Sequence, residues 1–532
     1  MSRMLVAIAL VVQAGMISTT TKGLPRGNGF KQTQTRGAGT GPRKDGGSAK
    51  QTIESALNAM GGEAKLRAIK SLRIVRQGYL NLIEQSERPE GPYIPALEHT
   101  TELWDLSGHR YSSENASSVT SDFDFSSKII VANGVAGRGF GQQMGPGSRA
   151  EIQQMEEWIE LSPFRVLLNA IDSADLHTEG DTVAQGVINH VVAFTWRSRP
   201  VRLLLNQHTS LPTVIEFVNA YPYDVFWNVW GDVTTKVYLS FWELGADGLQ
   251  YPRQLDVERN GMRLRTTMID SIAINPPLAD EAFALPENVR AAFEKRKDQT
   301  VEETPLGFPN RPPKELVAGV VYIPGSWGIS IVQQTDGLVI IEAPISAGYS
   351  AQVIDEAKRR FPSLPIKAVI TTSDAWPHFG GVREYVARGI PVYALDLNLP
   401  ILNRMVKSFR RLKPDALERK PRKPDFRVVS AKTIIGDGAN RLELYPVRTE
   451  TGERMIMIYF PQHHLLYGSD LIQPDRGGLF NAQYAYEAAQ AVKREGLTVE
   501  NIYAMHMNVS PWSKVIESIE RVTKPAAAAG NK

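Results

Sequence analysis

The hydrophobic pattern of the chain changes near Pro286, and this change constrains the fold more than any other feature. From Leu72 to about Pro286, apolar and polar residues alternate in short runs that Gly, Pro and Asn separate, as in antiparallel strands with one buried face. From Val317 to Val522, short apolar runs alternate with helix-like segments, which is typical of layered α and β elements. A chain of 532 residues is too long for one ordinary core. We therefore predict an α+β protein with two domains.

The residues between these patterns set the expected boundaries. Thr19 to Lys50 has almost no large apolar residue, and Pro286 to Leu316 is charged and proline-rich; such segments bury too little apolar surface to offset the entropy of ordering. The expected divisions are a signal peptide at 1–14, a disordered linker at 15–50, a β domain at 51–295, a linker at 296–316, a second domain at 317–523 and a tail at 524–532.

The first residues resemble a secretory signal. Arg3 precedes an apolar run from Met4 to Val12, and Val12 and Ala14 are the small residues that a signal peptidase prefers before a cleavage site. The alternative is a frayed apolar terminus. The run is shorter than the ~20 residues that span a bilayer, and we predict no membrane span. The chain has no cysteine, which excludes disulfides and thiol chemistry. Together these features predict a periplasmic or secreted protein.

The charge of the chain restricts its partners. A net charge of +3 is small for this length, and it argues against a dedicated nucleic-acid binder. The one basic run, Arg404 to Arg427, contains ten Lys or Arg and three acidic residues. It is either a solvated loop face or a surface that attracts an anionic substrate or a membrane. The oligomeric state does not follow from the sequence.

The strand-rich segment is expected to form a curved antiparallel β half-barrel wrapped on a helix, with the helix at residues 150–171. Six of the nine tryptophans of the chain lie in this segment. They are either core and rim aromatics, or some of them line a cavity for an apolar ligand. The six are Trp104, Trp158, Trp196, Trp227, Trp230 and Trp242.

Three residues that suit metal binding follow predicted strands of the second domain. His378 closes the loop after "AVITT", Asp470 ends "HLLYGSD", and His506 ends "IYAMHM". Two histidines and a carboxylate are enough for a mononuclear site with open positions. A cation held there would lower the pKa of a bound water toward about 7 and supply hydroxide. The alternative is that ordinary hydrogen bonds hold these three residues at the strand ends.

The segment Val317 to Val522 resembles the metallo-β-lactamase superfamily. "GLVIIEAP" is similar to the strand that leads to the first acidic position of that family, here Glu342, and "TSDAWPHFGG" occupies the place of its T-H-x-H-x-D-H-x-G-G loop. "YFPQHHLLYGSDLI" resembles the hairpin with the bridging aspartate, and "IYAMHMNVSPW" the strand end with the last histidine. The resemblance implies an αβ/βα four-layer sandwich.

The resemblance also implies a reduced metal site. The last loop histidine, the bridging aspartate and the final histidine match His378, Asp470 and His506, while four other ligand positions do not match. These positions fall on Ser373, Ala375, Pro377 and either Thr449 or Thr451. The first metal site of the family is therefore absent, and the second would hold one divalent ion, with zinc as the expected metal. Asp374 is expected either to serve as a fourth ligand or general base, or to cap a turn.

The N-terminal segment is similar to the β domain that precedes some exported metallo-hydrolases, and to the half-barrel of periplasmic lipoprotein carriers. The stretches that show this similarity are "ALNAMGGEAKLRAIKSLRI", "GDVTTKVYLSFWELGADGLQYPRQLDV" and "DEAFALPENV". Two functions stay open. One is a metal-dependent hydrolase of an ester, amide or lactone, and the other is an inactive pseudo-enzyme that binds a lipid or other apolar small molecule.

Overall fold

The computed structural model describes residues 46–83, 90–120, 123–141, 143–475, 478–479 and 482–523. The expected signal peptide, residues 15–45 of the expected linker and the tail lie outside these residues. Helix α2 (Gly46–Ala59) includes the last five residues of that expected linker, 46–50. Within the described residues, no helix is both long and apolar enough to cross a bilayer.

The N-terminal domain is built on a 13-stranded sheet in the order β6-β5-β4-β3-β2-β1-β13-β12-β11-β10-β9-β8-β7. The neighbouring strands pair antiparallel, which confirms the predicted large antiparallel sheet. In the described residues β6 and β7 are edges and do not pair with each other, and the half-barrel stays a prediction. The strands are β1 (Ser71–Asn81), β2 (Pro95–Asp105), β3 (Arg110–Thr120), β4 (Phe123–Ala132), β5 (Val135–Phe140), β6 (Gln143–Pro146), β7 (His177–Ala184), β8 (Val187–Trp196), β9 (Arg199–Asn206), β10 (Pro212–Ala220), β11 (Asp232–Leu244), β12 (Gln250–Arg259) and β13 (Met262–Ile274).

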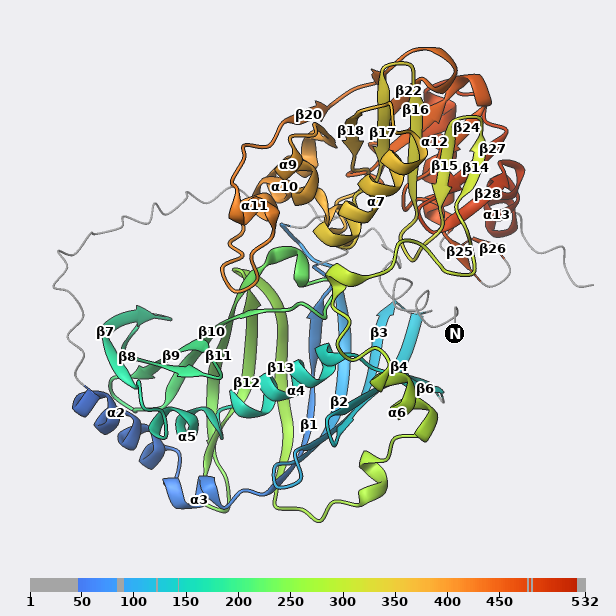
Figure 1. Ribbon diagram of the computed structural model, residues 1–532. Coiled ribbons are helices and arrows are strands. Elements are labelled where there is room, and N and C mark those ends of the chain that lie inside the picture. The colour runs from blue at the N-terminus through green and yellow to red at the C-terminus, as the bar shows by residue number, and fades with distance from the viewer. Residues whose placement is uncertain are drawn as a thin grey trace, which may run out of the picture.

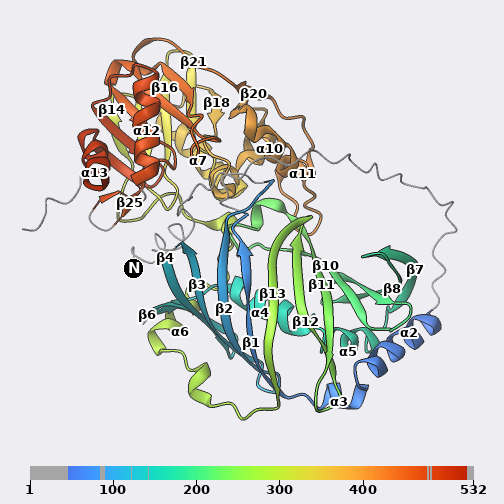
Figure 2. The same ribbon diagram turned by 180° about the vertical axis from the view of Figure 1, so that it is seen from behind.

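Helices line one face of this curved sheet (Figures 1 and 2). The expected single helix at residues 150–171 is two helices, α4 (Arg149–Glu160) and α5 (Val166–Ile171). Pro163 lies between them; it has no N–H to donate and disfavours the helical conformation at the residue before it. A capping box of Ser148 and Glu151 starts α4. Helix α2 packs against α5 and β7, and α3 (Glu63–Arg67) follows α2.

The segment expected to link the domains contains regular structure. Helix α6 (Glu287–Glu294) packs on β5 and β6, and the short helices η2 (Asp280–Phe283) and η3 (Val301–Glu303) lie before and after it. Val301 is buried in the same apolar cluster as the first helices of the second domain. The connection therefore packs on both domains.

The second domain contains two main sheets. The first has the order β14-β15-β16-β17-β18-β19-β20, with β17 to β20 parallel, and the second has the order β21-β22-β23-β24-β27-β28. The strands are β14 (Lys314–Val317), β15 (Val320–Ile323), β16 (Ile329–Gln334), β17 (Gly337–Ile341), β18 (Ile366–Ile370), β19 (Val392–Leu395), β20 (Phe426–Val429), β21 (Thr433–Ile435), β22 (Leu442–Pro446), β23 (Ile456–Phe460), β24 (Leu465–Tyr467), β27 (Asn501–Ala504) and β28 (Met507–Pro511). A small hairpin adds β25 (Pro474–Asp475) and β26 (Gly478–Leu479).

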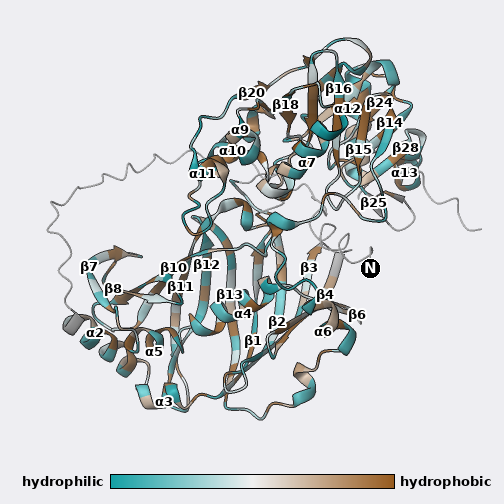
Figure 3. Ribbon diagram, in the orientation of Figure 1, coloured by the Kyte–Doolittle hydropathy of each residue, from teal (hydrophilic) through white to brown (hydrophobic). Residues whose placement is uncertain are grey.

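Three apolar clusters order the layers of this domain. One lies between the two sheets, one joins the outer face of the first sheet to α7, α9 and α10, and one joins the outer face of the second sheet to α12 and α13. Both faces of the first sheet are thus covered, which explains why β17 is buried along its whole length and why these strands are strongly hydrophobic (Figure 3). The helices are α7 (Ala347–Arg360), α9 (Val382–Arg388), α10 (Leu399–Val406), α12 (Ala482–Arg494) and α13 (Ser513–Thr523).

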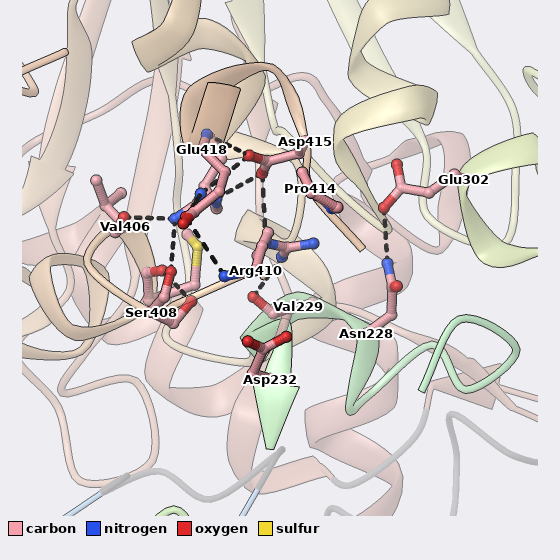
Figure 4. Close-up of polar contacts among 12 residues, drawn as sticks. Asn228, Val229, Asp232, Glu302, Val406, Ser408, Arg410, Pro414, Asp415 and Glu418 are labelled. Atoms are coloured by element: carbon pink, nitrogen blue, oxygen red, sulfur yellow. Dashed lines mark hydrogen bonds and ion pairs between the residues drawn. The ribbon is translucent and has the colours of Figure 1, made fainter. Parts of the chain in front are cut away.

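Part of the basic run holds the two domains together. Arg410 is 4% exposed, and its guanidinium donates to the carbonyl of Val229 at 2.7 Å. Figure 4 shows this contact between Arg410 and Val229. The carboxylate of Asp232 accepts the backbone N–H groups of Arg411 and Leu412. The expectation that the whole run is either a solvated face or an attracting surface is therefore wrong for this part, because its arginines satisfy backbone acceptors of the neighbouring domain.

Candidate metal site

The structure brings together the three residues that the sequence singled out. His378 lies on the four-residue helix α8 (Trp376–Phe379), which follows β18. Asp470 follows β24, and His506 lies in the turn between β27 and β28. Strands β24 and β27 are parallel neighbours, and their carboxyl ends therefore meet at one edge of the second sheet.

The ligand atoms of the three side chains converge. His378 Nε2 lies 2.7 Å from Asp470 Oδ2, and His506 Nε2 lies 3.2 Å from Asp470 Oδ1. One ligand atom of each residue lies within 4.8 Å of the other two. His378 and Asp470 are 1% and 5% exposed, while His506 is half-buried. The cluster is thus an aspartate between two imidazoles, reached from the His506 side.

The second nitrogen of each imidazole faces a polar group. His506 Nδ1 lies 2.8 Å from the carbonyl oxygen of Ser326, which requires that Nδ1 carry the proton and leaves Nε2 free to bind a cation. His378 Nδ1 lies 3.9 Å from Glu342 Oε2, which is beyond hydrogen-bond range but near enough for charge attraction. Both imidazoles therefore present Nε2 toward Asp470.

Glu342 is fully buried behind His378. Its carboxylate accepts hydrogen bonds from the hydroxyls of Thr372 and of Tyr467, the latter at 3.0 Å. Its backbone has φ 76°, a left-handed conformation that costs about 1–3 kcal/mol for a residue other than glycine. The fold thus places a buried glutamate with a strained backbone next to a candidate ligand.

The charges of the site oppose the effect of burial. Burial alone would lower the pKa of His378, but the nearby carboxylates, Asp470 above all, raise that pKa above its usual value. Burial would raise the pKa of Asp470, but His378 and His506 lower it. The pKa of Glu342 is raised, chiefly by burial. In the absence of a cation, Asp470 and His378 therefore form a charged pair.

This donor set suits a divalent cation. Two imidazoles and one carboxylate are ligands of zinc and of non-haem iron, and a backbone carbonyl already orients one imidazole. The contacts of 2.7 and 3.2 Å also describe a stable ion-paired cluster without metal. Both interpretations made from the sequence therefore remain compatible with the geometry.

The remaining predicted positions have other surroundings. Asp374 is buried, and its charge contributes to the raised pKa of His378. Asp374 does not belong to the group of described side chains whose ligand atoms gather within 4.8 Å, and its catalytic role stays a prediction. Pro377 is in the first turn of α8. Thr451 donates its backbone N–H and its hydroxyl to Glu487, at 2.9 and 2.6 Å, and this position therefore holds a buried hydrogen-bonded pair.

Sequence reasoning missed the contact that fixes α8. The ring of Trp376 lies 5.3 Å from that of Trp227 and 4.9 Å from that of Trp230, both edge-on. Trp227 and Trp230 belong to the N-terminal domain. Trp376 is fully buried between the two domains.

The N-terminal domain encloses a cavity of about 410 Å³. Trp104, Trp158 and Trp227 line it, so the cavity interpretation holds for these three of the six tryptophans. None of His378, Asp470 and His506 is part of its lining. The molecule therefore has two separate places where a ligand fits.

No protein-family model matches the sequence, and no curated protein matches it. Solved structures similar to the chain include a metallo-beta-lactamase from Pontibacter korlensis, with 16% identity, a TM-score of 0.31 and coverage of 40% of this chain and 98% of that one. An inverting sec-alkylsulfatase from Pseudomonas sp. has 16% identity and a TM-score of 0.29, and the match covers 40% of each chain. At such TM-scores these likenesses carry no argument about function, which depends here on the side chains described above.

Proposed function

We propose that the protein is a metal-dependent hydrolase with a single divalent ion held by His378, Asp470 and His506. The observation that carries the proposal is the convergence of three ligand atoms within 4.8 Å. The hydrogen bond of His506 Nδ1 to Ser326 supports it, because a metal-binding histidine usually donates its other N–H to such an acceptor. Zinc is the expected ion, since it accepts this donor set without a redox role.

The residues of the chain would have distinct tasks in this hydrolase. Glu342 places a negative charge 3.9 Å behind His378 Nδ1, and Asp470 lies between the two imidazoles. When bound, a divalent ion lowers the pKa of a coordinated water and polarises a carbonyl. Asp374 is the proposed general base, since it supplies a carboxylate on the same loop as His378. An ester, amide or lactone carbonyl is the proposed substrate group.

Other parts of the proposal rest on the sequence. Export to the periplasm or the cell exterior is supported by Arg3 and the apolar run from Met4 to Val12. A metallo-β-lactamase-like layered domain after a carrier-like half-barrel is supported by the motifs quoted above, with the degenerate ligand set as their consequence. The alternative function, an inactive pseudo-enzyme, is favoured by the 2.7 Å pair of His378 and Asp470, which balances the charges of the two groups without metal.

Metal content decides between these functions. The parent protein, a His378→Ala/His506→Ala variant and a His208→Ala control are incubated with zinc, passed through a desalting column and measured by elemental mass spectrometry. His208 is exposed in a turn far along the sequence from the site. About one equivalent of zinc in the parent and the control, with none in the double variant, supports the proposal. Metal-free parent protein would end it and leave the pseudo-enzyme.

A further inference from the structure

The cavity of the N-terminal domain has the size of a small-molecule site. Its volume of about 410 Å³ lies within the range of roughly 300–1,000 Å³ for ligand pockets. Large apolar side chains form much of its wall, including Ile74, Trp104, Trp158, Phe164, Leu255 and Ile272. Such a wall favours an apolar chain or ring system.

Several charged side chains also line the cavity, and most are paired within the protein. Arg76 and Glu102 form an ion pair at 2.8 Å, and Glu102 also accepts hydrogen bonds from Trp104, Tyr111 and Trp158. On the same wall the side chains of Arg265 and Glu98 pair at 3.0 Å. These groups satisfy one another, as buried charges must.

Glu157 is occupied in the same way. Its carboxylate accepts hydrogen bonds from the side chains of Gln153, Asn219 and Tyr221. The nearest cation, Arg259, stays 3.9 Å away from it, which is too long for a hydrogen bond.

Arg259 has a longer ion pair, at 3.9 Å, than Arg76 at 2.8 Å, Arg265 at 3.0 Å and Arg138 at 3.2 Å, the other cations of the wall. Its guanidinium lies over the rings of Tyr221 and Trp227, at 4.5 and 4.8 Å from their centroids. Its Nε is buried and, within the part of the chain that the structure describes, has no hydrogen-bond partner. The nearby Asp224 accepts the backbone N–H groups of Phe226 and Trp227. Burial raises the pKa of Asp224, and the charge of Arg259 acts to lower it. Within the described residues, Arg259 is therefore a cation of the wall whose nearest ion-pair contact is as long as 3.9 Å.

We propose that this cavity binds a long-chain amphiphile with one anionic headgroup, which pairs with Arg259 while the chain lies along the aromatic wall. A guanidinium that lies over aromatic rings keeps its N–H groups available to a carboxylate, sulfate or phosphate oxygen. Partial removal from water strengthens such a pair. The inference is independent of the metal site, since none of the three candidate ligands lines the cavity.

The test compares two ligands of equal chain length on the full-length, delipidated protein. Dodecanoate and dodecan-1-ol, both below their aggregation concentrations, are titrated by calorimetry at pH 8. The proposal expects dodecanoate to bind the parent at least about tenfold more tightly than dodecanol, the factor that a desolvated charged hydrogen bond supplies. Equal affinity for the two, or no binding of either, overturns it.

Two variants assign the preference to Arg259. Arg259→Met keeps the length of the stem and removes the charge, and it should reduce the preference to about twofold or less. Arg263→Met is the matched control, because Arg263 is exposed and does not line the cavity, and it should keep the parental preference. Retained preference in Arg259→Met overturns the proposal. If circular dichroism shows that this variant is unfolded, Arg259→Lys decides, since it must still prefer dodecanoate.

Discussion

Trp376 packs edge-on against Trp230, with 4.9 Å between ring centroids, although 145 residues separate them in the sequence. Trp376 lies two residues before His378 on the same short helix. A helix of four residues has no stability of its own, and the position of the candidate ligand therefore depends on an aromatic contact with the other domain.

Trp230→Ala should destabilise the protein through this contact. Trp230 is 1% exposed, and truncation of a buried tryptophan costs about 3–5 kcal/mol. Urea unfolding followed by circular dichroism measures the loss, and Trp230→Phe, which keeps an aromatic ring, should lose much less. Equal stability of Trp230→Ala and the parent would show that the contact does not stabilise the domain interface.

Asp415→Asn should break a buried charge cluster at the same interface. The Asp415 carboxylate pairs with Arg383 and also lies 3.3 Å from Arg410, and both guanidiniums are almost fully buried. Removal of one partner of a buried pair costs about 3–5 kcal/mol, because it leaves uncompensated charge. Asp425→Asn removes an exposed pair with Arg427 and should cost at most about 1 kcal/mol. Similar losses in the two variants of a urea titration would contradict this prediction.

Glu342→Gln should weaken metal binding without touching a proposed ligand. The substitution removes a carboxylate that lies 3.9 Å from His378 Nδ1, and the expected loss of zinc affinity is about 10-fold, the lower end of the range for a hydrogen-bonded outer-shell partner. Zinc affinity is measured by competition with a chromophoric chelator, and Glu356→Gln on the surface of α7 serves as the control. Unchanged affinity in Glu342→Gln would mean that Glu342 stabilises the loop only.

Glu102 should make the stability of the N-terminal domain depend on acid. Burial alone would raise the pKa of Glu102. Arg76 and the hydrogen bonds of two tryptophans lower that pKa by more than burial raises it, and the pKa therefore lies below its ordinary value. The unfolded chain, with a glutamate pKa near 4.3, then binds more protons than the folded one in acid. The contribution of Glu102 is present above about pH 4.3 and is lost as the pH falls toward the folded pKa.

Glu102→Gln separates this contribution from general acid denaturation. The variant should be less stable than the parent at pH 7, because Arg76 loses its buried partner. Between pH 6 and pH 3 its free energy of unfolding should fall less than that of the parent. Parallel pH profiles of the two proteins, measured by urea unfolding, would refute the assignment.

The sequence predicted features with a local signal. Alternation of period two identified the antiparallel sheet. The ends of three apolar runs identified His378, Asp470 and His506, which follow β18 of the first sheet and β24 and β27 of the second. The site geometry could not be predicted, since α8 is held both by the backbone N–H groups of Ala343 and Ile345 and by tryptophans from the other domain. No periodicity in either segment reports such a contact.

The strand parity of the charged residues in the sequence also indicates the charged wall of the cavity. Arg76 has the same strand parity as Leu72 and Ile74, and all three are buried. Glu102 has the parity of Trp104 on the neighbouring strand. A charged residue in the apolar phase of a strand marks an inward-facing pair, but a hydropathy pattern alone counts it as part of the solvent face.

The burial of Trp376 between the domains limits how modular this chain is. A cut within residues 296–316 would leave Trp227 and Trp230 on one fragment and Trp376 on the other. Each fragment would then expose an aromatic surface that it normally hides, and the second would also lose the support of α8. The C-terminal segment thus packs against this particular β domain. Neither exchange of the β domain nor expression of the segment alone would reproduce the position of His378.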